Sequence, residues 1–285
     1  MREFASPPSN IPKGEKANGW QASLSLGFEL RRERTVLTRR SHRGPLVVQR
    51  PFYPGDGVCH LYLLHPPGGV VGGDRLSVDL DLAPGCAALI TTPGATKLYR
   101  CNGLRASLEH RMRVADGASL EWLPQECILF PGAAGDVSTK IQLEGTARVA
   151  AWEIQCLGLP ALGQRFDNGD IGFNLEIWKD DSPLLLERLS LTTQVLDSLS
   201  GMRGMPVIGT MVVGPATDRA CEMARGVLVT ALPDCCGATL VDGLLVVRYL
   251  GESTSRVRHL FFRVWLILRQ LLLGWQPCAP RIWAT

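Results

Sequence analysis

The sequence predicts a mainly β protein with two α-helices near the C-terminus, and three observations support this fold class. Turn-forming pairs such as Asp56-Gly57 and Pro84-Gly85 recur at spacings near the ~8–12 residues of a strand plus its turn. Val78 to Leu82 alternates apolar and acidic side chains, as a strand with one wet face does. Helical patterns are confined to two late segments. We therefore expect mainly antiparallel β-sheet.

The chain begins with a segment that differs from the rest. Residues 1–18 are rich in Pro, Ser, Gly and Lys, which predicts a mobile N-terminal tail. Residues 19–285 contain no internal repeat, linker or break in composition, so we expect one domain there. Hydrophobic residues make up 46% of the chain, enough for a sizeable core.

Strands are expected at several places along this domain. The first, Val58 to Leu64, leads into a glycine-rich run, and others follow at Val78 to Leu82 and Ala147 to Leu157. Gly172 to Trp178 and Leu184 to Leu191 are separated by the turn-forming segment 179–183, which predicts a hairpin. Two short strands are also expected within 238–249, around Asp242-Gly243.

Two segments break the β pattern. Thr217 to Val229 contains helix-forming residues after a cap at Thr217 or Asp218. Arg256 to Leu273 is the clearer helix, with its cap within 253–255. Its narrow polar stripe contains Arg256, His259, Arg263 and Gln270, and the rest of its circumference is apolar. We expect such a helix to be nearly surrounded, by its own core or by another protein.

Charge and cysteine content restrict the class of protein. The net charge is only +3, although seven arginines and one acid occur between Arg31 and Arg50. Without a nucleic-acid motif, a solvated strand face or a protein contact is the better interpretation than nucleic-acid binding. The nine cysteines are scattered and no secretory signal precedes them, which indicates reduced thiols in a cytoplasmic protein. The most apolar run, Leu260 to Trp275, is too short and too charged to span a membrane.

The glycine-rich run is the most unusual feature. Four of the six residues from Gly68 to Gly73 are glycine, so the backbone there must approach other groups closely. The spacing resembles a phosphate loop, but Asp74-Arg75 occupies the positions of Lys and Ser/Thr. A carboxylate at that position would repel a phosphate, so nucleotide binding by this loop is not expected.

The same run carries a resemblance to a known family. His65 to Asp74 resembles the signature of the urease accessory protein UreD, called UreH in some bacteria, and four further segments agree with that family in the same order. These are Arg50-Pro51-Phe52-Tyr53-Pro54, Thr91 to Lys97, Leu123 to Gly132 and Arg281-Ile282-Trp283-Ala284-Thr285. The resemblance implies a layered, partly helicoidal β fold with helices near the C-terminus.

The resemblance also implies a function. UreD-like proteins are scaffold chaperones that bind the urease apoprotein and a second accessory protein, UreF, which recruits the nickel-carrying GTPase UreG. The assembly inserts nickel into the urease active site. On this interpretation the chain is not an enzyme, has no tightly bound cofactor, and meets Ni²⁺ only transiently.

Other classes of protein remain open. A stand-alone nickel metallochaperone would need a ligand cluster, yet His60 and His65 fall on opposite faces of a strand. Cys59 and His65 share a face but lie roughly 20 Å apart, and the pair Cys235-Cys236 would need further ligands. A β-sandwich hydrolase or ligand-binding module would need a triad or an aromatic pocket, and no sequence motif indicates either.

Candidate site residues follow from these interpretations. We expect no tight metal site and no catalytic residue, because tight nitrogen and sulfur ligands would trap nickel in transit. Four carboxylates are candidates to line an internal hydrated passage, in which an ion moves between weak oxygen sites: Asp74, Glu121, Glu126 and Glu176. The partner-binding candidates, for UreF, all lie on the last helix: Arg256, His259, Arg263, Leu266 and Gln270.

Overall fold

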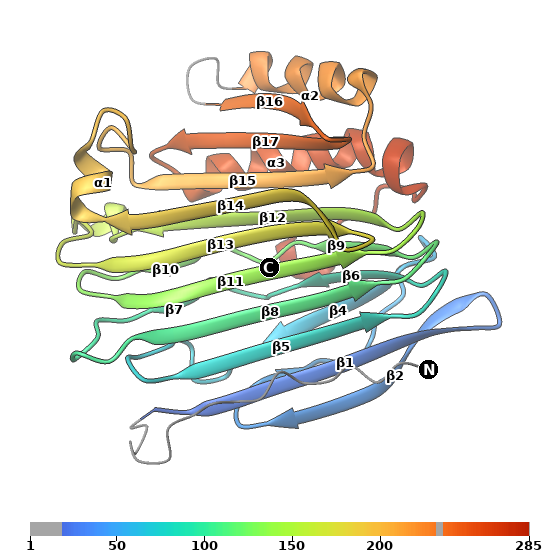
Figure 1. Cartoon of the computed structure of the whole chain (residues 1–285), viewed down its shortest axis with the longest axis horizontal. Coiled ribbons are helices and arrows are strands. Elements are labelled where there is room, and N and C mark those ends of the chain that lie inside the picture. Colours follow the sequence, from blue (N-terminus) through green and yellow to red (C-terminus); the bar gives the residue numbers. More distant parts are fainter. Residues whose placement is uncertain (1–18, 232–235, 285) are drawn as a thin grey trace.

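A computed structural model describes residues 19–231 and 236–284, which fold into two stacked β-sheets with helices at one end (Figure 1). The seven-stranded sheet contains, in spatial order, β14 (Ser182–Thr192), β13 (Asp170–Lys179), β11 (Ala134–Leu143), β8 (Ala106–Val114), β5 (Arg75–Leu82), β1 (Gln21–Arg31) and β2 (Arg34–Arg43). The ten-stranded sheet contains β16 (Cys236–Val241), β17 (Leu244–Gly251), β15 (Val207–Gly214), β12 (Arg148–Leu157), β9 (Ser119–Trp122), β6 (Ala87–Thr91), β4 (Cys59–Leu64) and β3 (Val47–Val48), with β10 (Cys127–Leu129) and β7 (Thr96–Leu98) paired beside β12. The mainly β fold class is confirmed.

The three α-helices lie in the C-terminal third of the chain, between and after its last strands. The short α1 (Thr193–Asp197) comes after β14, and α2 (Asp218–Ala231) precedes β16. The longest, α3 (Thr254–Leu268), begins at Ser253, whose hydroxyl accepts a hydrogen bond from the Arg256 amide. It continues as a π-helical turn, Arg269–Leu273. Helices α2 and α3 correspond to the two predicted segments, whereas α1 is too short to have a recognisable period.

The centre of the molecule consists of successive helicoidal turns of the chain, each of which adds a parallel strand to both sheets. After β4 the chain alternates between the sheets, so that β5, β8, β11 and β13 join one sheet and β6, β9 and β12 join the other. Neighbouring strands within each of these sets are parallel and in register, as the ladder Leu80, Met112 and Ile141 illustrates. This arrangement confirms the layered, helicoidal character of the fold.

The expectation of mainly antiparallel pairing was wrong for this central region. Antiparallel pairs occur at its margins, in β1–β2, β13–β14, β12–β15 and β15–β17–β16. The hairpins predicted at segment 179–183 and at Asp242-Gly243 are among them. Most of the other turn pairs connect strands of different sheets, and turn chemistry alone does not reveal which strand becomes the hydrogen-bonded partner.

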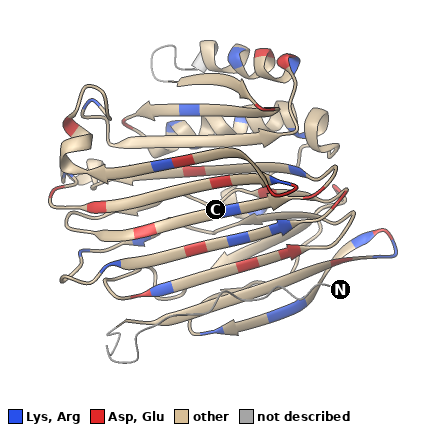
Figure 2. Cartoon of the chain, in the orientation of Figure 1, with Lys and Arg blue, Asp and Glu red and all other residues tan. Residues whose placement is uncertain are grey.

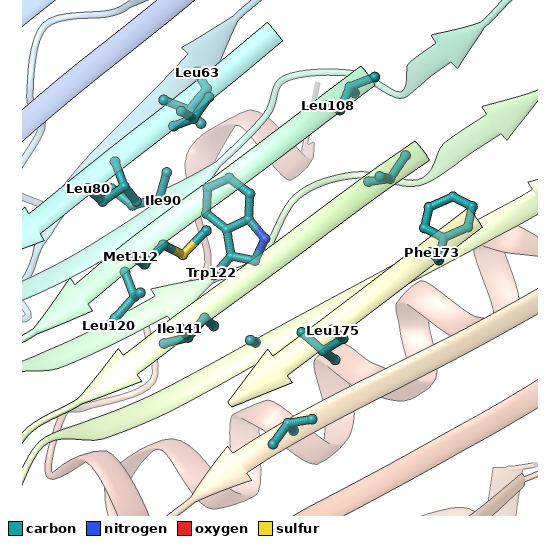
Figure 3. Packing of buried hydrophobic residues seen from close by; sticks show 14 of the residues in the cluster. Leu63, Leu80, Ile90, Leu108, Met112, Leu120, Trp122, Ile141, Phe173 and Leu175 are labelled. Atoms are coloured by element: carbon teal, nitrogen blue, oxygen red, sulfur yellow. The ribbon is translucent and has the colours of Figure 1, made fainter. Parts of the chain in front are cut away.

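Two hydrophobic cores result. The first fills the space between the sheets, where Leu80, Met112 and Ile141 approach Ile90 and Trp122 (Figure 3). The second lies between the ten-stranded sheet and the helices, and its α3 members are Val257, Leu260, Phe261, Val264, Trp265 and Leu268. The last helix is therefore anchored by one face.

The outer face of the seven-stranded sheet is covered by charges of both signs (Figure 2). Arg111 donates a hydrogen bond of 2.7 Å to Asp79, and Arg113 donates one of the same length to Glu144. Exposed pairs of this kind contribute little stability individually, but they keep this face wet and fix which side of the sheet is buried. The arginine-rich segment identified in the sequence forms β2, at the edge of this sheet.

Two further predictions concern the N-terminal tail and the absence of a membrane-spanning helix. The predicted tail, residues 1–18, lies outside the described residues. Within the described part of the chain, no helix has the length and apolar character needed to cross a membrane.

Candidate functional site

A cavity of about 110 Å³ lies between the two sheets. Such a volume holds several water molecules if polar groups are present to bind them. Its wall is mostly apolar and is interrupted by polar side chains from both sheets and from the segments beside them: His65, Thr92, Thr96, His110, Gln125, Cys127, Glu153 and Gln155. These groups make the cavity the best candidate for an interior site.

Glu153 is the acidic group in this cavity. It is the only charged residue between Val149 and Leu157, and strand alternation directs it toward the space between the sheets. Burial raises the pKa of Glu153 to about 7. The negative charge of Glu187 also raises this pKa, whereas a hydrogen bond from Thr139 lowers it. Its carboxyl group therefore changes between neutral and ionised forms near neutral pH.

His110 is held close to the same Thr139. The His110 Nδ1 atom lies 3.0 Å from the Thr139 hydroxyl, and its ring packs 5.1 Å from that of Trp122. Burial lowers the pKa of His110 to about 4, so the imidazole is neutral at pH 7. Thr139 thus links a neutral histidine on β8 with the carboxyl group of Glu153 on β12.

Gln125 connects this cavity to the surface. It lines the interior cavity and also a groove of about 330 Å³ between α3 and the C-terminal segment. Its Oε1 atom accepts a hydrogen bond of 2.6 Å from Nη1 of Arg258 on α3. The neighbouring Glu126 faces the same arginine, with 3.5 Å between the Arg258 Nε and Glu126 Oε2 atoms. The interior cavity and the surface groove are therefore adjacent.

The groove has an aromatic wall. Trp152 and Trp283 approach each other with 5.5 Å between ring centroids, and Phe262 meets Trp283 edge to face at 6.0 Å. His259, from the predicted partner-binding set, is at its rim. An apolar groove with a charged rim suits the anchoring of a partner side chain.

The predicted partner-binding residues share one side of α3 and of the π-helical turn that continues it. Arg256, His259, Leu266 and Gln270 are exposed, and Arg263 is half-buried. Spacings of three and four residues align all five in a single stripe opposite the core-facing residues. Leu266 is 37% exposed, so it does not belong to the core beneath α3 and is accessible to a partner.

Glu121 lies outside the cavity and the groove, among the side chains that anchor α3. It is 1% exposed and accepts hydrogen bonds from the Trp265 indole at 2.7 Å and from Arg269 at 2.7 Å. Arg269 also pairs with Asp56 at 2.8 Å, and Asp56 lies 3.0 Å from His60 Nε2. Although burial opposes ionisation, hydrogen bonds from His60, Val58 and Arg269 lower the pKa of Asp56. Glu121 is therefore paired on the outer side of the ten-stranded sheet.

Asp74 holds the glycine-rich run in place. Its carboxylate accepts hydrogen bonds from the Trp20 amide at 2.8 Å and the Val71 amide at 3.0 Å. The close backbone approach expected there is also present, since a Cβ atom at Gly69 would lie 2.1 Å from the Tyr99 ring. Asp74 consequently has a backbone-binding role.

Glu176 does not line the cavity either. Its neighbours Leu175 and Ile177 face the intersheet core, so strand alternation places Glu176 on the outer face of the seven-stranded sheet. It is half-buried and accepts a hydrogen bond from the Trp178 indole at 2.9 Å. None of the four predicted carboxylates lines the cavity or the groove, although Glu126 follows Gln125 in the sequence and faces Arg258.

The candidate metal ligands do not converge either. Cys59 is in the intersheet core, His60 pairs with Asp56, and His65 lines the interior cavity. Cys235 lies outside the described residues. Among residues 19–231 and 236–284, no group of three His, Cys, Asp or Glu side chains is arranged to hold a metal ion.

Sequence reasoning missed Glu153, His110 and Thr139. One signal was available for Glu153, since a single carboxylate in a long apolar strand indicates a special environment. No comparable signal marked His110 and Thr139, because their proximity depends on the register of β8 with β11.

These features define a β-layered protein with a mostly apolar interior cavity that contains several polar groups, and with a helix-lined surface groove. Comparison with known proteins then gives its family. The model of the UreD urease accessory protein family matches residues 21–284, so the chain belongs to the UreD family.

Individual relatives support the same assignment. A urease accessory protein UreD of Klebsiella pneumoniae subsp. pneumoniae is 46% identical over 267 residues, covering 94% of this chain and 96% of the relative. The UreD of Azoarcus sp. (strain BH72) is 47% identical over 270 residues, covering 94% and 95%. The UreD of Pseudomonas putida (strain W619) is 44% identical over 275 residues, covering 96% and 98%.

Proposed function

We propose that this UreD-family chain is a cytoplasmic scaffold chaperone that lets nickel pass through its interior into the urease apoprotein. The observation that carries the proposal is the position of Gln125, which lines both the cavity between the sheets and the groove beside α3. One side chain and its hydrogen bond to Arg258 thus lie between an interior space and the surface. The chain itself catalyses no reaction on this proposal.

The chemistry of the cavity suits a cation in transit. A protonated Cys127 thiol and a Glu153 that titrates near neutral pH are weak ligands in their resting forms, and the neutral His110 imidazole supplies a single nitrogen, which is too few ligands for a tight site. Burial and the neighbouring Glu153 raise the pKa of Cys127, so no thiolate is present to trap nickel. An approaching divalent cation favours the ionised form of Glu153 and gains one weak oxygen ligand. Nickel is the cargo and has no permanent site.

The exposed stripe of α3 is the proposed docking surface for UreF. It presents Arg256, His259, Arg263, Leu266 and Gln270 beside the aromatic groove. A mixed stripe next to an apolar groove has the composition of a protein interface, with an apolar centre and a polar rim. UreG would join through UreF, and the urease apoprotein would occupy a separate surface.

The test separates transit from assembly. Glu153→Gln keeps the shape of the side chain but removes the ionisable oxygen from the cavity. We expect the variant to co-purify with UreF and urease in normal yield, while nickel per urease active site falls severalfold. The matched control is Glu176→Gln, which removes a carboxylate from the outer face and should leave nickel loading unchanged. Normal loading in the Glu153→Gln complex would exclude this cavity as the route. Failure of the wild-type chain to co-purify with either partner would contradict the scaffold role itself.

A further inference from the structure

A third concave site has lining residues that differ from those of the interior cavity and of the α3 groove. This surface pocket has a volume of about 910 Å³ and is built from two segments far apart in the sequence, Arg50 to Tyr53 and Arg281-Ile282. Arg34, Gln49 and Tyr62 complete its lining. The two segments belong to motifs that the scaffold role leaves unexplained.

Aromatic rings support two of the arginines in this pocket. The Arg34 guanidinium carbon lies 3.5 Å from the ring centroid of Tyr53, and that of Arg281 lies 5.6 Å from the ring centroid of Phe52. A guanidinium above an aromatic face keeps its N–H groups available at its edges, and it is held with less loss of freedom when a ligand binds. The ring stacking therefore pre-organises hydrogen-bond donors.

The positive charge of the pocket is not neutralised by neighbouring acids. Within residues 19–231 and 236–284, none of Arg34, Arg50 and Arg281 forms an ion pair with a carboxylate. By contrast, Arg111 and Arg113 on the outer sheet face are each paired. Three unpaired guanidinium groups around one concavity attract an anion.

Tyr62 is an independent sign of a ligand. It is only 9% exposed, it lines the pocket, and its hydroxyl has no hydrogen-bond partner in the described part of the chain. Leu61 and Leu63 on either side face the intersheet core, so Tyr62 points to the opposite side of β4. A buried hydroxyl without a partner is unfavourable unless a ligand or solvent meets it.

We propose that this pocket binds an oxyanion, a carboxylate or phosphate group, through Arg34, Arg50, Arg281 and the hydroxyl of Tyr62. Guanidinium groups bind both kinds of group with paired N–H donors, and the tyrosine supplies an O–H donor. The pocket is far larger than a bare oxyanion, so the group belongs to a larger molecule whose remainder contacts Pro51 and Phe52. This binding does not depend on nickel transit.

The experiment is isothermal titration of the purified full-length chain with citrate and, separately, with inorganic phosphate at low ionic strength. We expect saturable binding of at least one probe at one site per chain. Binding of citrate alone identifies the carboxylate source, and binding of phosphate alone identifies the phosphate source. Arg281→Gln and Arg50→Gln should each weaken binding by about tenfold, the typical effect of losing one hydrogen bond to a charged group.

Two further variants make the result specific. Tyr62→Phe keeps the charge and the ring but removes the hydroxyl, and it should weaken binding severalfold. Arg40→Gln is the matched control, because Arg40 is an exposed arginine on the same strand as Arg34 and does not line the pocket. Thermal melting verifies that each variant is folded. The proposal is overturned if neither probe binds saturably, if Arg40→Gln weakens binding as much as Arg281→Gln, or if Tyr62→Phe has no effect.

Discussion

Arg258 on α3 donates a hydrogen bond of 2.6 Å to Gln125, and this contact lies where the interior cavity meets the surface groove. The two residues come from distant parts of the sequence, and both line the groove. A docking partner that reaches Arg258 would therefore also affect the side chain that borders the cavity. On the proposed function, partner recognition at α3 is therefore coupled to the interior cavity.

The first prediction concerns the size of the side chain at Gln125. Gln125→Trp should obstruct the junction, so nickel per urease active site should fall severalfold at unchanged complex yield. Gln125→Ala removes the hydrogen bond without blocking the space and should retain most of the nickel loading. Atomic absorption of the purified urease, with the yield of assembled complex measured in parallel, checks both variants. Equal loading in the two would show that nickel does not pass this point.

The second prediction distinguishes the two faces of α3. Leu266 is 37% exposed, so Leu266→Asp should change the free energy of unfolding by less than about 1 kcal/mol. Leu260 is 1% exposed, and Leu260→Asp buries an unpaired charge that should cost more than about 4 kcal/mol. Urea unfolding measures both. Leu266→Asp should nevertheless reduce co-purification with UreF, and normal recovery of UreF would remove this residue from the interface.

The sequence predicted the parts of this fold that depend on local chemistry. The hairpin of β13 and β14, the cap at Ser253 and the polar stripe of α3 each arise from neighbouring residues. Parallel stacking could not be predicted in the same way, because the pairing of Met112 with Leu80 and Ile141 joins strands from different turns of the chain. Resemblance to a family provided the helicoidal arrangement, which periodicity did not.

The same distinction applies to the candidate site. Glu121 and Glu176 were predicted from the sequence as candidates to line an internal passage. Their environments depend on tertiary partners, Arg269 in one case and the outer sheet face in the other. Glu153 and His110 are linked only through Thr139, which belongs to a third strand, β11. Local sequence does not specify such a contact.

The third prediction concerns the buried charges beneath α3. Arg269 is 1% exposed and pairs with both Glu121 and Asp56. Arg269→Met leaves the buried Glu121 without its cation and removes one of the two partners of Asp56, so it should lower the free energy of unfolding by about 3–5 kcal/mol. Adding Glu121→Gln should recover part of this loss, because one uncompensated charge is removed. Urea unfolding of both single variants and the double variant measures the coupling. Simple additivity of the single effects would contradict a direct charge pair.

The last prediction is the pH dependence that Glu153 gives to stability. Burial raises the pKa of this carboxyl group from 4.5 to about 7 in the folded chain. Because the folded pKa is raised, the protonated group favours the folded state below pH 4.5, and this contribution is lost as the pH rises through 7. The shift corresponds to roughly 3 kcal/mol as an upper bound, since the group faces a cavity that admits water.

Glu153→Gln removes this titration while keeping the size and shape of the side chain. Between pH 5 and pH 8, the free energy of unfolding of the wild type should fall relative to that of the variant, by up to roughly 3 kcal/mol. Glu176→Gln is the control, because its carboxylate lies on the outer face, and it should follow the wild type across the same range. Urea unfolding at several pH values gives these differences directly. A wild type and a Glu153→Gln variant with parallel pH profiles would mean that Glu153 is ionised throughout, and its proposed change of state on meeting a divalent cation would then be wrong.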